Sequence, residues 1–124
     1  MSKKRILVVD EEADLVFGLK IQLEKDNFHV LTAKDGQEGL NKVRQEKPDL
    51  LILDLMLPKL DGYKVCRMLK FDEKYKSIPI ILLTARTQQE DQKVGYEVGA
   101  DAYITKPFDA QELLKKIKEL LKEV

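Results

Sequence analysis

Several features that would narrow the class of this protein are scarce in its sequence. Cys66 is the single cysteine, so no internal disulfide can form, which is compatible with a reducing, cytoplasmic environment. Basic and acidic residues number 22 each, a balance that indicates neither nucleic acid nor a membrane surface as a bulk partner. No apolar run approaches the length of a membrane span, and the polar residues 1–5 are unlike a signal peptide.

What the sequence does contain is typical of a globular domain. Its 124 residues are 44% hydrophobic and 35% charged, a mixture that is ordinary for a soluble protein with a real core. No linker and no low-complexity stretch interrupts it. We therefore expect one domain over residues 1–124.

Short, continuously apolar segments alternate with segments of helical periodicity. Leucines recur at every fourth position from Leu15 to Leu23, the spacing of one helix face. Val94 and Val98 mark a later helix, which Gly99 would end as a left-handed cap. The predicted strands cover residues 6–9, 29–33, 50–53, 80–83 and 102–104, and a predicted helix follows each of them.

The order of these elements predicts an α/β fold. Five strands that alternate with five helices imply a parallel sheet with right-handed crossovers and helices on both faces. Two helix starts are also marked in the sequence. Asp35 precedes Glu38 by three residues and Asp109 precedes Glu112 by three, and each pair resembles a capping box.

Polar residues follow four of the five predicted strands, at the point where each strand ends. Asp10 and Glu11 follow the first strand, Asp54 the third, Thr84 the fourth and Lys106 the last. The carboxyl ends of parallel strands meet at one edge of the sheet, where open α/β sheets bind their ligands. The sequence therefore places these side chains at the rim of one cleft.

Together these side chains have the chemistry of a phosphoryl site. Three unpaired carboxylates would repel one another and raise one another's pKa, and a hard cation such as Mg²⁺ relieves this. Lys106 adds a fixed positive charge, Thr84 adds a hydroxyl, and the Asp54 carboxylate is a possible nucleophile. Taken singly, such an Asp is more often a turn residue and such a Lys a surface residue. The joint pattern at four strand ends favours the site.

With these residues in view, the chain resembles the receiver domain of two-component response regulators. The segments that carry the resemblance are 6–12 (ILVVDEE), 50–62 (LLILDLMLPKLDG), 80–85 (IILLTA) and 99–108 (GADAYITKPF). The resemblance implies a flavodoxin-like, doubly wound five-stranded parallel sheet in the order 2-1-3-4-5, with five helices. It also implies that the Lys106–Pro107 peptide bond is cis.

The resemblance assigns a role to each matching position. It implies that Asp54 is the phosphoacceptor and that Thr84 and Lys106 contact the phosphoryl group. It implies that Tyr103 is the aromatic side chain whose position follows phosphorylation. The implied Mg²⁺ ligands are Asp10, Glu11, Asp54 and the backbone carbonyl of Met56. The chain departs from the family at Glu11, because this position is most often Asp, and the longer side chain puts the Mg²⁺ affinity in question.

The function that follows is a signalling switch and not an enzyme. A histidine kinase or phosphotransfer protein would donate the phosphoryl group, and the face formed by the fourth helix, the last strand and the last helix would change its binding preference. Two alternatives stay open: a pseudo-receiver that only docks, and a phosphatase of the haloacid dehalogenase type, which needs an Asp where Met56 stands. His29 and Cys66 are interpreted as structural. The cognate kinase and the output cannot be read from the sequence.

Assembly is expected to be weak. Receivers of the winged-helix regulator class pair through that same face by charged contacts across a two-fold axis. Asp101, Glu112 and Lys116 match that pattern, whereas Gln92 and Ala102 stand where the class carries charges. We expect a monomer when the chain is unphosphorylated and at best a weak dimer when it is phosphorylated.

Overall fold

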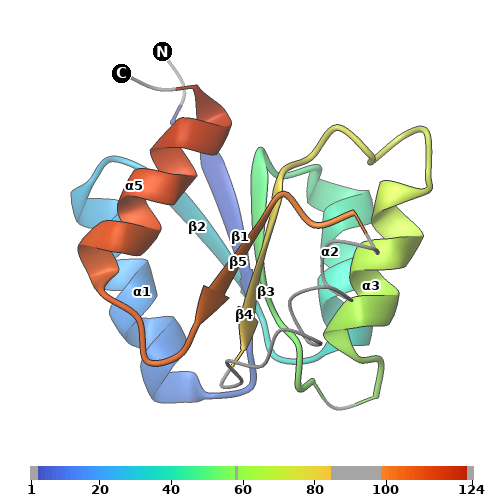
Figure 1. The fold of residues 1–124 in the computed structure, drawn as a ribbon, viewed down its shortest axis with the longest axis horizontal. Helices are drawn as coiled ribbons and strands as arrows, with labels where there is room; N and C mark the ends of the chain where they lie inside the picture. The colour runs from blue at the N-terminus through green and yellow to red at the C-terminus, as the bar shows by residue number, and fades with distance from the viewer. Residues whose placement is uncertain (1–2, 58, 85–98, 123–124) are drawn as a thin grey trace.

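The computed structural model describes residues 3–57, 59–84 and 99–122 and shows helices packed on both faces of a central sheet. Helices α1 and α5 cover one face, and α2 and α3 cover the other (Figure 1). The strands are β1 (Arg5–Val9), β2 (His29–Ala33), β3 (Leu50–Asp54), β4 (Ile80–Thr84) and β5 (Ala102–Thr105). The helices are α1 (Ala13–Lys25), α2 (Gly36–Glu46), α3 (Gly62–Lys70) and α5 (Ala110–Leu121).

The sheet has the topology that the resemblance implied. All of its neighbouring strands run parallel, in the order β2-β1-β3-β4-β5. This confirms the flavodoxin-like, doubly wound α/β class. Four helices fall within the described residues, and the further helix predicted around Val94 and Val98 lies outside them. Gly99, which follows, has a φ of +90°, the left-handed conformation expected of a helix-ending glycine.

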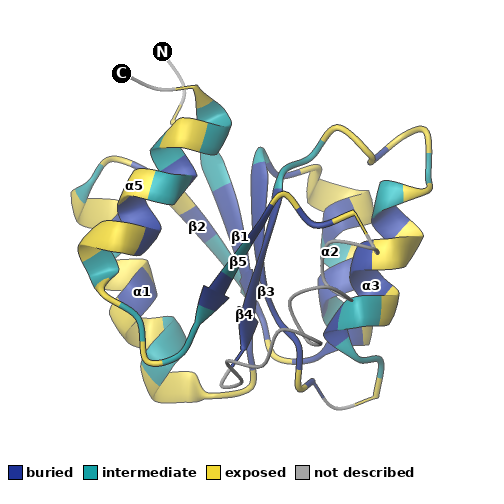
Figure 2. Cartoon of the chain, in the orientation of Figure 1, coloured by how far each residue is buried: buried dark blue, intermediate teal, exposed yellow. Residues whose placement is uncertain are grey.

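The two central strands carry the core. Every residue of β3 and β4 is buried, as Figure 2 shows for the middle of the sheet. Their side chains alternate between the two faces, so Leu51 and Leu53 pack with α2 and α3, whereas Leu50 and Ile52 pack with α1 and α5. A strand that is covered on both faces has a continuous apolar run in its sequence. This is why the sequence predicted these strands.

Three of the four helices within the described residues begin at an aspartate whose side chain caps the helix. The Asp35 side chain accepts a hydrogen bond of 2.8 Å from the backbone N–H of Glu38 and begins α2, as predicted. Asp109 caps α5 but accepts its 2.8 Å bond from Gln111 rather than from Glu112. Asp61, which the sequence analysis did not single out, caps α3.

The two side chains interpreted as structural lie away from the carboxyl edge of the sheet. Cys66 is fully buried in the cluster beneath α2 and α3, and burial raises the pKa of its thiol to about 12. A thiol with that pKa is unreactive at neutral pH. His29 is exposed at the start of β2, at the opposite end of that strand from the polar edge. Both positions agree with structural roles.

An internal ion pair ties the end of α3 to the start of β4. Lys70 Nζ lies 2.7 Å from Asp101 Oδ2 and donates to the backbone carbonyls of Ile78 at 2.9 Å and Lys76 at 3.0 Å. The same Asp101 oxygen accepts a 2.8 Å bond from the N–H of Ile80. Only 10% of the Lys70 side chain is exposed, against 34% for Asp101. The pair therefore holds three separate chain segments together.

Removal of this cation should destabilise the fold. Lys70→Met keeps most of the apolar stem but deprives Asp101 of its cation and two carbonyls of their donor, and we expect a loss of about 2 kcal/mol in urea unfolding. The matched control is Lys116→Met, because the Lys116–Glu119 pair, at 3.0 Å, is 43% and 48% exposed. An exposed pair contributes under about 1 kcal/mol. Equal effects of the two substitutions would contradict the assignment.

Candidate functional site

The polar strand ends meet at one edge of the sheet, as the sequence predicted. Asp10 directly follows β1, Asp54 and Thr84 are the last residues of β3 and β4, and Lys106 directly follows β5. Asp10, Asp54 and Thr84 are all buried, at 2%, 5% and 1% exposure. Buried polar side chains at the end of an otherwise apolar sheet need partners within the protein.

Lys106 is the centre of the cluster. Its Nζ lies 2.8 Å from Asp10 Oδ2, 3.0 Å from Glu12 Oε1 and 3.6 Å from Asp54 Oδ1. Only 13% of the lysine side chain is exposed. The Lys106–Pro107 peptide bond is cis, which confirms that expectation. The structure thus brings Asp10, Asp54 and Lys106 together from three different strands.

The carboxylates are held by the backbone as well. The N–H of Glu12 donates a 2.9 Å bond to Asp10 Oδ1, so each oxygen of Asp10 has a donor. The N–H of Met56 donates a longer bond of 3.4 Å to Asp54 Oδ1. Asp54 is therefore the less firmly held of the two carboxylates within the described residues, because its contacts to Met56 and to Lys106 are both long.

Burial and charge perturb the site in a definite direction. Burial raises the pKa of Asp54, the neighbouring Asp10 raises it further, and Lys106 offsets only part of this. Burial alone would lower the pKa of Lys106, but the hydrogen bonds that its ammonium donates to Asp10 and Glu12 outweigh burial and raise its pKa overall. The lysine is therefore a fixed cation, while Asp54 carries a charge that the fold accommodates poorly.

This imbalance predicts a stability gain at neutral pH when Asp54 becomes neutral. The pKa of Asp54 in the folded chain lies above its value in the unfolded chain, so ionised Asp54 destabilises the fold. The whole of this destabilisation is present when the pH is above the folded pKa, and none of it is present when the pH is below the unfolded pKa. Asp54→Asn should therefore raise Tm by a few degrees at pH 7 in Mg²⁺-free buffer, where about 1 kcal/mol corresponds to about 4 °C. The gain should vanish as the pH falls below about 4. A calorimetric series against pH checks both parts, and a gain that persists in acid would contradict this origin.

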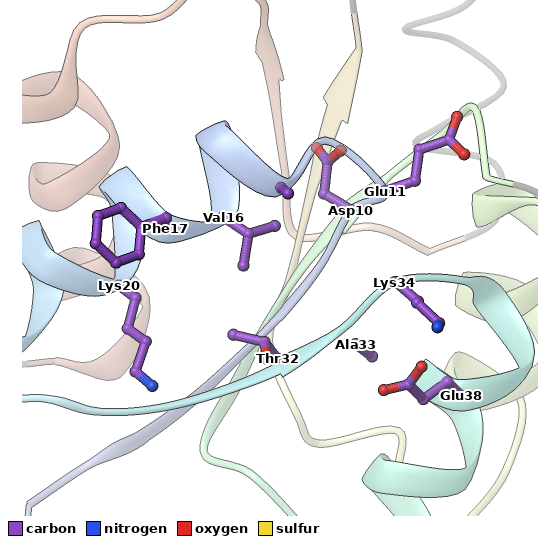
Figure 3. Close-up of a pocket in the computed structure, with 10 residues that line it drawn as sticks. Asp10, Glu11, Val16, Phe17, Lys20, Thr32, Ala33, Lys34 and Glu38 are labelled. Atoms are coloured by element: carbon purple, nitrogen blue, oxygen red, sulfur yellow. The ribbon is translucent and has the colours of Figure 1, made fainter.

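Glu11 is exposed, whereas Asp10 beside it is buried. Figure 3 shows the carboxylates of Asp10 and Glu11 leaving the loop after β1 in different directions. Among the described residues, no three His, Cys, Asp or Glu side chains converge closely enough to hold a metal ion. The structure brings together two of the three predicted carboxylates and leaves Glu11 at the rim.

The chemistry of the residues nevertheless fits a hard divalent cation. Asp10 and Asp54 present two buried carboxylates to one lysine, which leaves an excess of negative charge. Oxygen ligands of this kind are those that Mg²⁺ prefers. Glu11 is on the adjacent loop with an exposed, rotatable side chain. Met56 lies two residues after the end of β3 and is 60% exposed.

The two residues expected to form a switch lie on neighbouring strands. Thr84 is paired with Thr105 across β4 and β5, and Tyr103 is paired with Leu82. Tyr103 is half-buried and packs against the apolar cluster beneath α2 and α3. That cluster lies on the opposite face of the sheet from α5.

Sequence reasoning missed Glu12. The acidic pair was identified at Asp10 and Glu11, but the glutamate that contacts Lys106 beside Asp10 is Glu12, the next residue along the chain. The run of three acidic residues after β1 was a signal that could have included it. A cavity of about 490 Å³ was also not predicted. It lies between α1 and β2 beside Asp10, and the exposed ring of Phe17 is in its wall (Figure 3).

Comparison with known proteins defines the class. Residues 6–118 match the response regulator receiver domain family. The chain is 46% identical over 119 residues to the alkaline phosphatase synthesis transcriptional regulatory protein PhoP of Bacillus subtilis, covering 96% of this chain and 49% of that protein. The chain therefore belongs to the response regulator receiver family of two-component systems, which is a signalling family and not a catalytic one.

Solved structures agree with this class. A CheY-like response regulator receiver domain protein from Methanospirillum hungatei superimposes with a TM-score of 0.91 at 33% identity, covering 98% of this chain and 95% of that chain. The receiver domain of a sensor histidine kinase from Pseudomonas aeruginosa superimposes with a TM-score of 0.89 at 26% identity, covering 98% of this chain and all 100% of that one, and it holds a magnesium ion in its active-site cleft.

The match to the curated relatives is partial in one respect. The chain spans about half the length of the curated relatives it matches, with 49% of the Bacillus subtilis regulator covered. Within the described residues, no helix has the length and apolar character needed to cross a bilayer.

Proposed function

We propose that this chain is a phosphorylation-dependent switch in which Asp54 accepts a phosphoryl group. The observation that carries the proposal is the Lys106 cluster, where one buried cation faces Asp10 and Asp54 at the carboxyl edge of the sheet. A carboxylate that is poorly compensated, at the end of a rigid strand and beside a fixed cation, is suited to accept a phosphoryl group. We infer that residues 1–124 act as one receiver domain.

The transfer is a displacement at phosphorus. A carboxylate oxygen of Asp54 attacks the phosphorus of a phosphohistidine on a histidine kinase or phosphotransfer protein. The new O–P bond forms as the P–N bond breaks, and the electron pair of that bond stays on the imidazole. Lys106 Nζ then compensates the charge of the phosphoryl oxygens. Attack by water at phosphorus breaks the O–P bond, releases inorganic phosphate and returns the Asp54 carboxylate. The chain supports these steps on itself and turns over no other substrate.

Asp10, Glu11, Asp54 and the carbonyl of Met56 are the proposed ligands for Mg²⁺. When bound, the ion would supply the positive charge that a phosphoryl group needs in addition to Lys106. Glu11 would have to turn inward from its exposed position to take part. Its side chain is one methylene longer than the Asp most often found at this position, so we expect Mg²⁺ affinity to depend on how Glu11 is placed.

The proposed response involves Thr84 and Tyr103. Thr84 ends β4 next to Asp54, because Asp54 is paired with Leu83, the residue before it. We infer that its hydroxyl binds the phosphoryl group and that Tyr103 then moves inward against its apolar cluster. The face that includes β5 and α5 would change its preference for a downstream effector, which the sequence and the fold do not identify. A cytoplasmic location fits a partner that carries a phosphohistidine.

The test is labelling with a small phosphodonor. Acetyl phosphate with Mg²⁺ should add one phosphoryl group per chain as an acyl phosphate that hydroxylamine releases, and EDTA should prevent this. Intact-mass spectrometry gives the stoichiometry. A chain that is folded by circular dichroism, binds Mg²⁺ and takes up no label would favour the pseudo-receiver alternative. Release of phosphate from many donor molecules without a stable label would favour the phosphatase.

Assembly through the β5–α5 face is expected to be weak. The Asp101 carboxylate is already engaged by Lys70 and by the N–H of Ile80, and Ala102 is buried. Gln92 lies outside the described residues. We expect sedimentation velocity to report a monomer, and at most a weak dimer with a beryllofluoride phosphoryl mimic, because orientation at such interfaces depends on complementary charge. A tight dimer of the unmodified chain would contradict this expectation.

A further inference from the structure

Glu12 contacts the phosphoryl site by two routes, although no role has been assigned to it above. Its backbone N–H donates to Asp10 Oδ1 at 2.9 Å, and its side-chain Oε1 lies 3.0 Å from Lys106 Nζ. Lys106 Nζ in turn lies 2.8 Å from Asp10 Oδ2. The three residues therefore form a closed ring of contacts that joins the start of α1 to the loop after β5.

The ring holds Lys106 on one side of the site. The lysine nitrogen is within hydrogen-bond distance of Asp10 and Glu12 but 3.6 Å from Asp54. Two carboxylates thus compete with Asp54 for one cation, and both are nearer to it. In the function proposed above, that cation is needed at Asp54.

The exposure of Glu12 allows its contact with Lys106 to break. Its side chain is 61% exposed, whereas that of Asp10 is fully buried. Glu12 and Lys106 line an open groove of about 450 Å³ with Leu15, Pro107 and Phe108, which gives the glutamate room to swing outward. An ion pair with an exposed carboxylate is weak, so the Glu12–Lys106 contact is the weakest in the ring. It is also the first contact that a phosphoryl group would replace.

We infer that Glu12 is a positioning residue that holds Lys106 away from Asp54 until a phosphoryl group arrives. This rests on the proposed function of Asp54. Because the Glu12–Lys106 contact exists before transfer and is given up during it, the contact stabilises the unphosphorylated chain but neither the transition state nor the product. Loss of the contact therefore speeds phosphorylation and leaves dephosphorylation unchanged.

The test compares Glu12→Gln and Glu12→Asp with the parent chain. Acetyl phosphate labelling with Mg²⁺ should be about two- to five-fold faster in Glu12→Gln, the size expected of one exposed ion pair, with the same half-life of the acyl phosphate. Glu12→Asp keeps the charge but is one methylene too short to reach Lys106, so it should be faster as well. The matched control is Glu73→Gln, which removes a remote exposed partner 2.9 Å from Lys76 and should leave both rates unchanged.

Each outcome decides the inference. If Glu12→Asp behaves like the parent while Glu12→Gln is faster, the effect is repulsion of the anionic donor, and the positioning role is wrong. If both rates change together, Glu12 acts on the transition state, and the inference is again wrong. A crystal structure of Glu12→Gln gives a readout that does not depend on labelling. Lys106 Nζ should move closer to Asp54, and an unmoved lysine would overturn the inference even if the parent chain were never labelled.

Discussion

Asp54→Asn should take up no phosphoryl group from acetyl phosphate under conditions that label the parent chain fully. An amide oxygen is a far weaker nucleophile than a carboxylate, and the substitution otherwise keeps the size and shape of a side chain that is 5% exposed at the end of β3. Intact-mass spectrometry after incubation with Mg²⁺ measures the loss, and we expect labelling at background.

This result is informative because misfolding cannot account for it. Asp54→Asn is expected to be more stable than the parent at neutral pH, since it removes a buried carboxylate. The fold raises the pKa of that carboxyl group, which means that it disfavours the charged form. The parallel control is Asp72→Asn, at a carboxylate in the loop after α3 that caps a turn by accepting from the N–H of Lys74 at 2.9 Å. That variant should be labelled like the parent. Equal labelling of Asp54→Asn would show that another side chain is the acceptor.

Gly62→Ala should cost about 3 kcal/mol of folding free energy, the upper end of the usual cost of overpacking. Gly62 begins α3 and packs directly on the backbone of the strand that carries Asp54. A Cβ there would overlap the carbonyl oxygen of Asp54 and lie 2.8 Å from the Cα of Leu55. These are buried backbone atoms at the end of β3 and in the residue after it, so neither neighbour can rotate away, and the strain has to be taken up by movement of the strand end or the helix. Urea unfolding measures the loss.

The chain offers a matched control for this substitution. Gly18 is an exposed glycine inside α1, and a Cβ built there would meet nothing within 4 Å. Gly18→Ala should therefore stabilise the protein by about 0.5–1 kcal/mol, the usual gain of Ala over Gly in a helix. If Gly62→Ala is as well tolerated as Gly18→Ala, the close approach of α3 to Asp54 is not present in solution. We also expect Gly62→Ala to slow labelling, because any relief of the overlap displaces Asp54.

Much of the fold was predictable because its strands are buried on both faces. Segments such as Leu50–Asp54 and Ile80–Thr84 read as unbroken apolar runs that end in one polar residue, so the sequence revealed both the strands and the edge where the site lies. The order of the strands did not follow from such local patterns. It came from the resemblance, and the sheet order confirms it.

What could not be predicted depends on side-chain direction and on contacts between distant segments. Lys106 and Asp10 are 96 residues apart, and only the fold shows that Glu12 and not Glu11 shares that lysine. Both glutamates follow the same strand, and the turn into α1 decides which side chain faces the site. The approach of Gly62 to Asp54 is equally invisible in the sequence, since a glycine before a helix is usually interpreted as part of a turn.

The ion pair between Asp101 and Lys70 affects how well this protein avoids binding the wrong signalling partner. A cell that carries several receivers of one fold needs each of them to avoid the wrong partner, and exposed complementary charges are the simplest means of mutual attraction. In this chain Lys70 and the N–H of Ile80 already occupy the Asp101 carboxylate. We expect this arrangement to reduce crosstalk, because a foreign receiver would have to compete with an internal ion pair for that charge.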